Sequence, residues 1–126
     1  MTKYLAVALG SALGGMARYF VSETWLGRYA APFPAATLCI NLSGSFILGF
    51  FATLAAERWT LNPHWRLAVA VGFVGAYTTF STFEYETALL WAWREITLAV
   101  LYVILSIGWG FLAVQAGIAL ARVSLR

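Results

Sequence analysis

Glycines, hydroxyl groups and aromatic rings are concentrated in one short stretch of an otherwise apolar span. The stretch is residues 72–83, GFVGAYTTFSTF. A carbonyl oxygen freed from a helix is a hard ligand for a small cation, and the positive edge of a phenyl ring can face an anion. In hydrocarbon every backbone N–H and C=O needs a partner, so an interrupted helix is tolerated only where it is buried in protein or lines a cavity or an ion site. The stretch is therefore the first candidate for a functional site.

The composition of the 126-residue chain is that of a membrane protein. Hydrophobic residues make up 62% and charged residues only 10%, far from the composition of a soluble domain. Four windows with few or no charges each reach the length of about 20 residues that a spanning helix needs. These windows are residues 4–21, 35–56, 67–93 and 96–121. We expect one all-α membrane domain, residues 1–126, of four transmembrane helices, with the third helix broken near the midplane at about residues 75–79.

The basic residues carry a topology signal. With four helices both termini lie on one side of the membrane. Five basic residues lie on that side, namely Lys3, Arg58, Arg66, Arg122 and Arg126. Three lie on or toward the other side, namely Arg18, Arg28 and Arg94. The bias is weak, so it favours cytoplasmic termini but leaves insertion in both orientations open. Because the eight basic residues are scattered, the net charge of +3 does not indicate a nucleic-acid partner.

Polar side chains form two stripes with a four-residue spacing. Thr37, Asn41 and Ser45 share one face of the second window. Tyr102 and Ser106 share one face of the fourth, and Gly110 continues that stripe without a hydroxyl. Two such stripes can together line one polar path through the protein.

Small residues and hydroxyls are also the usual contacts between packed transmembrane helices. We prefer this packing interpretation for Gly10 with Gly14 and for Ala113 with Gly117. Asn41 is different, because an unpaired primary amide in an apolar medium costs several kcal/mol. It must bond a neighbouring helix or meet a polar ligand, and the sequence leaves both open.

Three charged residues fall within the expected helices. Arg18 can extend to the interface or pair with Glu23, and its position argues against a cleaved signal peptide. Glu84 and Glu86 follow the interrupted stretch at an unusual depth for carboxylates. Glu84 lies about one helical turn from the break and is expected to face protein or water rather than lipid.

Phe80 and Phe83 are three residues apart and project from nearly the same helix face. Ordinary core or lipid-facing packing is one interpretation. The other is that their rings present edges to an anion, which the amide and hydroxyl donors nearby favour over a cation. Elsewhere, Cys39 is expected to be a packing residue, and His64 has no second ligand at metal-site spacing.

Three motifs resemble those of the CrcB/Fluc fluoride channels, in order and over nearly the whole chain. The first is Gly14-Gly15-x-x-Arg18. The second is Asn41-x-x-Gly44-Ser45-Phe46-x-x-Gly49. The third, and the most specific, is Gly72-x-x-Gly75-x-x-Thr78-Thr79-Phe80-Ser81-Thr82-Phe83.

The resemblance implies a fluoride channel of the bacterial inner membrane, an antiparallel dual-topology homodimer that exports fluoride passively and confers resistance to it. Each dimer would carry two pores. A structural sodium ion would lie at the dimer centre, held by backbone carbonyls of the broken third helix, and Gly75 and Thr78 match those positions. The implied partners are therefore fluoride, sodium, a second copy of the chain and the lipid bilayer.

The resemblance also assigns pore residues. Phe80, Phe83 and Asn41 match the phenylalanines and the asparagine of the family's pore, and Arg18 is placed at a vestibule. The remaining residues of the expected polar track are Thr37, Ser81, Thr82, Tyr102 and Ser106. Two residues depart from the pattern: Glu84 stands where a small polar residue is expected, and Gly110 interrupts the hydroxyl stripe.

Two other functions remain as alternatives. A small proton-coupled multidrug exporter needs an embedded carboxylate in its first helix. Residues 4–21 contain none, although Glu84 and Glu86 could take that role. An accessory subunit that docks a partner through the broken helix is the second alternative. We do not expect an enzyme, because the sequence shows no nucleophile with a base, no metal-ligand cluster and no phosphate-binding loop.

Overall fold

A computed structural model describes residues 1–24, 32–57 and 62–125. Arg28, Arg58 and Arg126, three of the basic residues that bear on topology, lie outside these residues. The described chain is helical and contains no strand. Its elements are α1 (Thr2–Thr24), α2 (Ala35–Glu57), α3 (Pro63–Arg66), the π-helix η1 (Leu67–Val74), α4 (Gly75–Tyr77), α5 (Phe80–Ala92) and α6 (Ile96–Ser124).

Four helical stretches are long and apolar enough to cross a membrane, which confirms the predicted number of spans. They are Thr2–Glu23, Ala35–Glu57, Pro63–Ala92 and Ile96–Ser124. The third span begins at Pro63, earlier than the sequence predicted. The reason is a local cap: the Asn62 side chain accepts a hydrogen bond of 3.0 Å from the His64 backbone N–H, and proline is well suited to the first helical position.

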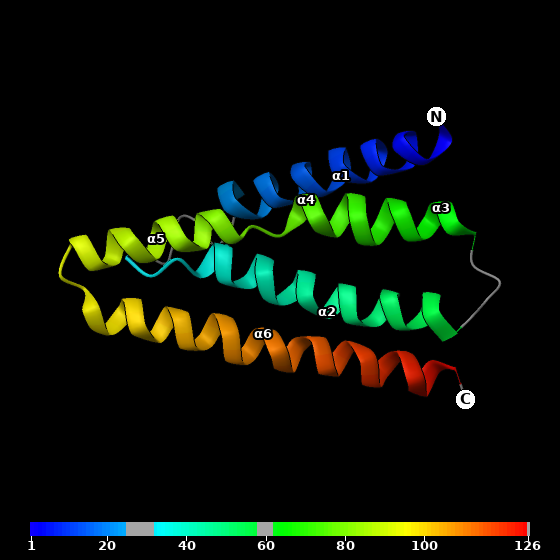
Figure 1. Ribbon diagram of the computed structural model, residues 1–126. Coiled ribbons are helices and arrows are strands. Elements are labelled where there is room, and N and C mark those ends of the chain that lie inside the picture. The colour runs from blue at the N-terminus through cyan, green and yellow to red at the C-terminus, as the bar shows by residue number, and fades with distance from the viewer. Residues whose placement is uncertain (25–31, 58–61, 126) are drawn as a thin grey trace.

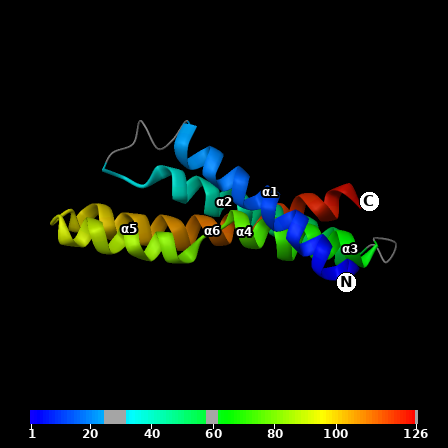
Figure 2. The same cartoon turned by 90° about the horizontal axis from the view of Figure 1, so that it is seen from above.

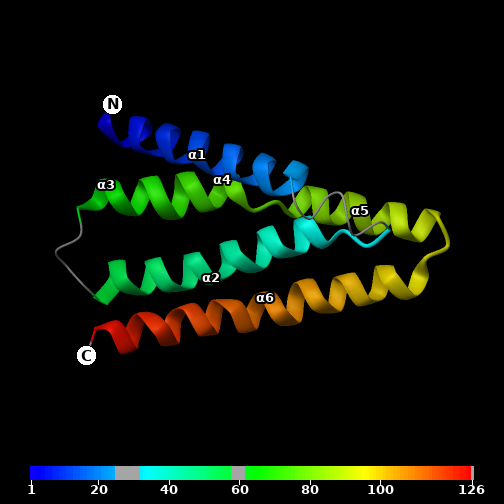
Figure 3. The same cartoon turned by 180° about the vertical axis from the view of Figure 1, so that it is seen from behind.

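The helices form two closely packed pairs. α2 runs along α6, and α1 runs along η1 and α4, while contacts between the two pairs are sparser (Figures 1 and 3). Viewed from above, α1 lies at a slant to α6 (Figure 2). Both termini lie at one end of the molecule, and the turn between α5 and α6 lies at the other (Figure 1). In a membrane crossed by these spans, the two ends would lie on opposite sides.

The backbone between α4 and α5 leaves the helical conformation at two residues. Thr78 (φ −77°, ψ 156°) and Thr79 (φ −150°, ψ 114°) are extended, whereas Gly75 (φ −61°, ψ −34°) is helical. Thr79 then caps α5, because its hydroxyl oxygen accepts the Thr82 backbone N–H. The extended pair is the thin segment between α4 and α5 in Figure 1. Its depth in the bilayer stays a prediction.

Glycines of α1 let that helix approach η1 closely. A Cβ atom at Gly10 would overlap the backbone of Ala68, and one at Gly14 would overlap the backbone of Phe73. The packing interpretation of Gly10 and Gly14 is confirmed.

Glycines serve the same purpose between α2 and α6. A Cβ at Gly49 would overlap the backbone of Val114, and one at Gly117 would overlap the backbone of Phe46. The packing role predicted for Gly117 is therefore confirmed, and the two helices meet backbone to backbone.

Replacing Gly14 by alanine is expected to destabilise the protein by about 1–3 kcal/mol, because backbone atoms of η1 must move to admit the methyl group. The midpoint of thermal unfolding in detergent should fall. Gly15→Ala is the matched control, since a Cβ at Gly15 meets nothing within 4 Å. Equal midpoints for the two variants would contradict the close contact between α1 and η1.

Candidate functional site

The Asn41 side chain forms a pair of hydrogen bonds with the backbone of Thr79. Its amide nitrogen Nδ2 donates to the Thr79 carbonyl oxygen at 3.0 Å, and the Thr79 N–H donates to Asn41 Oδ1 at 2.9 Å. The amide oxygen therefore supplies the acceptor that the Thr79 N–H lacks outside a helix. The amide nitrogen adds a donor to the Thr79 carbonyl, which as the N-cap of α5 also accepts the first hydrogen bond of that helix. Of the two possibilities that the sequence left open, the structure shows the bond to a neighbouring span, and one of the two Nδ2 hydrogens remains for another acceptor.

This pairing changes the hydrogen bonding of two carbonyls. In a continuous α-helix the Thr79 N–H would bond the Gly75 carbonyl, and the Thr82 N–H would bond the Thr78 carbonyl. Here the Thr79 N–H donates to Asn41, and the Thr82 N–H donates to the Thr79 hydroxyl at 3.4 Å. The carbonyls of Gly75 and Thr78 thus lose their regular helical donors. These are the two positions that the resemblance assigned to sodium.

A cavity of about 280 Å³ lies where α2, the interruption, α5 and α6 meet, and its lining is mainly apolar with a few polar groups. Its size suits a small ion with several waters, each of which occupies about 30 Å³ in the liquid. The polar side chains of its lining are hydroxyls and one amide, and no charged residue lines it among the described residues. The lining consists of Asn41, Gly44, Ser45, Leu48, Val74, Thr78, Thr79, Phe80, Phe83, Ser106 and Ile107.

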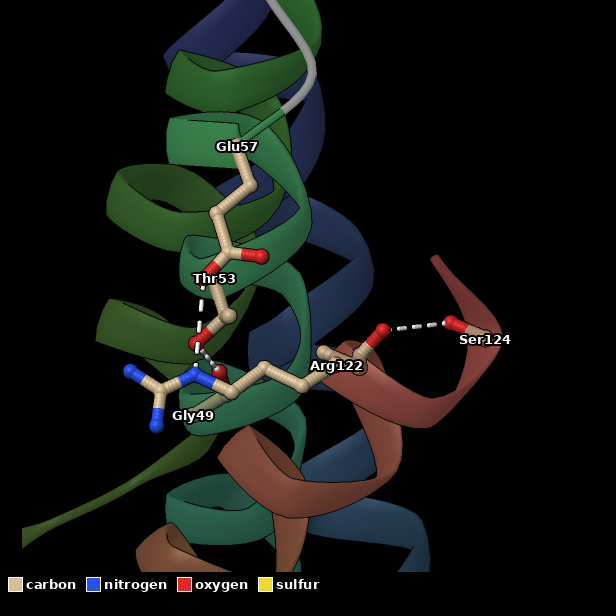
Figure 4. A network of polar contacts seen from close by, with 6 residues as sticks. Gly49, Thr53, Glu57, Arg122 and Ser124 are labelled. Atoms are coloured by element: carbon tan, nitrogen blue, oxygen red, sulfur yellow. Dashed lines mark hydrogen bonds and ion pairs between the residues drawn. The ribbon is translucent and has the colours of Figure 1, made fainter. Parts of the chain in front are cut away.

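Ser106 supplies a hydroxyl without a partner. Its Oγ is buried and has no hydrogen-bond partner in the part of the chain that the structure describes. Helical hydroxyls in apolar surroundings usually bond the carbonyl four residues earlier. Thr53 does so with the Gly49 carbonyl at 2.7 Å, as Figure 4 shows, and Thr87 does so with the Phe83 carbonyl at 2.7 Å. Ser106 borders the cavity, and its buried hydroxyl hydrogen remains without an acceptor among the described residues.

Phe80 and Phe83 both line the cavity but differ in burial. Their ring centroids are 5.7 Å apart with an interplanar angle of 42°. Phe83 is only 9% exposed, and its ring lies edge-on to Tyr102 with a centroid distance of 5.1 Å. Phe80 is 70% exposed on the protomer. The structure thus brings together the predicted residues Asn41, Phe80, Phe83 and Ser106.

Glu86 binds two hydroxyls of the predicted track. Thr37 Oγ1 donates to Glu86 Oε1 at 2.8 Å, and the Tyr102 hydroxyl donates to Glu86 Oε2 at 2.7 Å. The sequence pointed mainly to Glu84, which is exposed. A signal for Glu86 was present, because a residue three positions after Phe83 shares its helix face.

The other predicted residues lie away from the cavity. Ser81 and Thr82 are exposed, and the Thr82 hydroxyl pairs with the Thr79 hydroxyl at 2.8 Å. Arg18 is half-buried on α1 and does not line the cavity. The ion pair considered between Arg18 and Glu23 is absent from the described part of the chain.

The structure also places Cys39 and His64. Cys39 is exposed on α2 of the protomer, so the packing role expected for it is not filled by contacts in the protomer's interior. The His64 ring bonds Asn62 Oδ1 at 2.8 Å and Thr2 Oγ1 at 3.1 Å, which ties the start of α1 to α3. Within residues 1–24, 32–57 and 62–125, no group of three metal-binding side chains is found.

The fold and the site define a small multi-pass membrane protein whose interrupted third span borders a cavity with hydroxyl and amide groups in a mainly apolar lining. The model of the CrcB-like protein family, described as camphor resistance (CrcB), matches residues 5–118, so the chain belongs to this family. This membership confirms the predicted family and places the protein in the bacterial plasma membrane.

Three curated relatives, each named a fluoride-specific ion channel, FluC, match over almost the whole chain. The protein of Acidobacterium capsulatum is 48% identical over 91% of this chain and 92% of its own length. That of a Synechococcus species is 44% identical over 93% and 90%. That of Solibacter usitatus is 42% identical over 95% and 98%. The chain thus belongs to a family of channels rather than enzymes, as predicted.

Replacing Asn41 by leucine should destabilise the protein, because the N–H of Thr79 loses its partner in an apolar region, whereas the Thr79 carbonyl keeps the first hydrogen bond of α5. The expected loss is about 1–3 kcal/mol for each buried group left unpaired. Thermal unfolding in detergent measures it. Ser45→Ala is the control, since Ser45 lines the same cavity and no hydrogen bond of its side chain occurs within the described residues. Equal unfolding midpoints for the two variants would count against the pairing of Asn41 with Thr79.

Proposed function

We propose that the protein is a fluoride channel that lets fluoride leave the cytoplasm passively and so confers resistance to it. The observation that carries the proposal is the unpartnered Ser106 hydroxyl, on a residue that lines the same cavity as Asn41 and two phenylalanine rings. The names of the relatives support the choice of ion.

The chemistry of the cavity suits fluoride. Fluoride is small and strongly hydrated, so a selective path must replace water by closely spaced hydrogen-bond donors. Ser106 offers an O–H and Asn41 a second N–H, while the edges of Phe80 and Phe83 offer weaker positive charge. The lining contains no cation that would hold the anion tightly, and passage through a channel requires release as well as binding.

The proposed path continues from Ser106 toward the end of the molecule opposite the termini. Tyr102 precedes Ser106 by one turn of α6, and Thr37 precedes Asn41 by one turn of α2. An anion there competes with Glu86 for the two hydroxyl hydrogens. Ser81 and Thr82 belong to the outer part of the path, and Arg18 raises the local anion concentration near a mouth of the channel.

A second copy completes the channel in this proposal. In a single protomer the cavity beside Asn41 is open to the outside, and the Phe80 ring that lines it is largely exposed. The weak charge bias of the sequence is compatible with two chains in opposite orientations. An antiparallel homodimer with a pore in each protomer and the interrupted third spans near the membrane midplane accounts for both features.

A structural sodium ion fits the interruption. The carbonyls of Gly75 and Thr78 have lost their helical donors, and uncharged oxygens are suitable ligands for a small alkali cation. Two antiparallel copies would supply four such oxygens at their contact. The ion would supply a fixed positive charge there, and the chain's own part is to hold the carbonyls in place through Asn41.

The multidrug-exporter alternative is not favoured. The first span contains no carboxylate before Glu23 at its end, and Glu86 is engaged by two hydroxyls. The three curated relatives are named as channels for fluoride.

Liposomes loaded with fluoride and chloride test the proposal. The reconstituted protein should release fluoride, measured with a fluoride electrode, and retain chloride. Phe80→Ile or Phe83→Ile should abolish fluoride release without unfolding the protein, because the aliphatic side chain has no positive ring edge. Phe111→Ile is the control, since Phe111 is 63% exposed on α6 and lies outside the cavity. Normal release by both cavity variants would refute the assignment of the rings.

A further inference from the structure

Two hydrogen-bonded contacts with α2 hold the interruption of the third span, one on each side of Thr78. After Thr78, the Thr79 backbone pairs with Asn41. Before it, the Tyr77 hydroxyl lies 2.9 Å from Ser43 Oγ. Asn41 and Ser43 are two residues apart on the same helix. Both ends of the segment 77–79 are therefore bonded to α2.

Tyr77 is the donor in its bond to Ser43. Ser43 has a single hydroxyl hydrogen, and its Oγ already donates to carbonyls of its own helix, at 2.7 Å to Cys39 and 3.2 Å to Ile40. The Tyr77 hydrogen therefore points to Ser43 Oγ, which accepts it. Because Ser43 keeps its own donor bond in either case, loss of the Tyr77 hydroxyl would leave no hydrogen of Ser43 unpaired.

Packing and a local hydrogen bond restrain the same segment. The Tyr77 side chain is 8% exposed, and its ring stacks on Phe73 with a centroid distance of 5.6 Å and an interplanar angle of 16°. Gly44 lets α2 approach the interruption, since a Cβ atom there would overlap the Thr78 side chain. The Thr78 hydroxyl turns back and donates to the Val74 carbonyl at 2.9 Å. The residues that precede and carry the Thr78 carbonyl are thus held in place.

We propose that Tyr77 is a positioning residue for the sodium ion: through its bond to Ser43 it holds the carbonyls of Gly75 and Thr78 in the arrangement that binds the cation. The inference rests on the proposed sodium site and adds to it two side chains that supply no ligand atom. It differs from a packing role, because it predicts a change in sodium affinity when the hydroxyl is removed and the ring is kept.

The physical reason is preorganisation. A site made of backbone carbonyls binds a cation only when its peptide groups are ordered, and any ordering that remains to be done on binding lowers the affinity. Tyr77 lies between Gly75 and Thr78 in the chain, so a bond at its hydroxyl restrains the peptide groups on both of its sides. The Thr78 carbonyl has lost its regular helical donor, so contacts with α2 take over its restraint.

Tyr77→Phe tests the proposal in the full-length protein purified in detergent, because it removes the hydroxyl and keeps the stacked ring. Binding of a radioactive sodium isotope is titrated to saturation, with choline replacing sodium at constant ionic strength. The dissociation constant for sodium should rise several-fold, and the number of ions bound at saturation should not change. Tyr85→Phe is the matched control, since Tyr85 is 66% exposed on α5, and it should bind sodium as the wild type does.

Substitutions of Ser43 separate the hydrogen bond from packing. Ser43→Thr keeps the accepting oxygen and adds a methyl group at an exposed position of α2, so the sodium affinity should equal that of the wild type. Ser43→Ala removes the acceptor and should weaken sodium binding as much as Tyr77→Phe does. The double variant Ser43→Ala with Tyr77→Phe should bind sodium no more weakly than either single variant, because the two residues act through one bond.

Two results would overturn the positioning role. The first is an unchanged dissociation constant for sodium in Tyr77→Phe, even if the midpoint of thermal unfolding falls, because the bond would then stabilise the fold alone. The second is an additive loss of sodium affinity in the double variant, because the two residues would then act separately.

Measurements on the wild-type protein separate this inference from the proposed function. Absence of saturable sodium binding would reject the sodium site and the positioning role with it, whereas fluoride efflux from the same preparation would decide the channel function. Sodium binding and fluoride efflux in the wild type, together with unaltered sodium affinity in Tyr77→Phe, would reject the positioning role alone.

Discussion

The hydrogen-bond pair between the Asn41 amide and the Thr79 backbone is the interaction on which the rest of the site depends. A backbone N–H outside a helix cannot remain unpaired in hydrocarbon, and Asn41 Oδ1 supplies the acceptor that the Thr79 N–H needs, while its Nδ2 also donates to the Thr79 carbonyl. Because the Thr79 N–H is thereby removed from the helical pattern, the Gly75 carbonyl is freed. One side chain of α2 thus joins two features that the sequence presents separately, the cavity donor and the interrupted backbone.

The packing of the helices leaves space beside Asn41. Glycines bring α1 onto η1 and α2 onto α6 at backbone contact. Between the two pairs the contacts are sparser, and the cavity lined by Asn41, Phe80 and Ser106 lies in that region.

The sequence predicts the spans well, because bilayer thickness and the need to pair every backbone group constrain them strongly. The glycines and hydroxyls of residues 72–83 likewise point to an interruption, although the helical conformation of Gly75 shows that composition alone does not locate its first residue. The partner of Asn41 could not be predicted, since a four-residue spacing identifies a helix face but not the element that faces it.

The same limit explains why the sequence did not predict the surroundings of Glu84, Glu86 and Cys39. Which of Glu84 and Glu86 turns toward Thr37 and Tyr102 depends on the rotation of α5 after two extended residues, and no local pattern fixes that rotation. The exposure of Cys39 depends in the same way on which faces of α2 its neighbours cover.

The cavity beside Asn41 carries fluoride only if an anion path exists through the assembled protein. Recording the reconstituted wild-type protein in a planar bilayer tests this most directly, with a gradient of sodium fluoride and equal chloride on both sides. The current is predicted to reverse at the Nernst potential of fluoride. Reversal at zero or at the Nernst potential of sodium, or the absence of any current, would contradict a fluoride path.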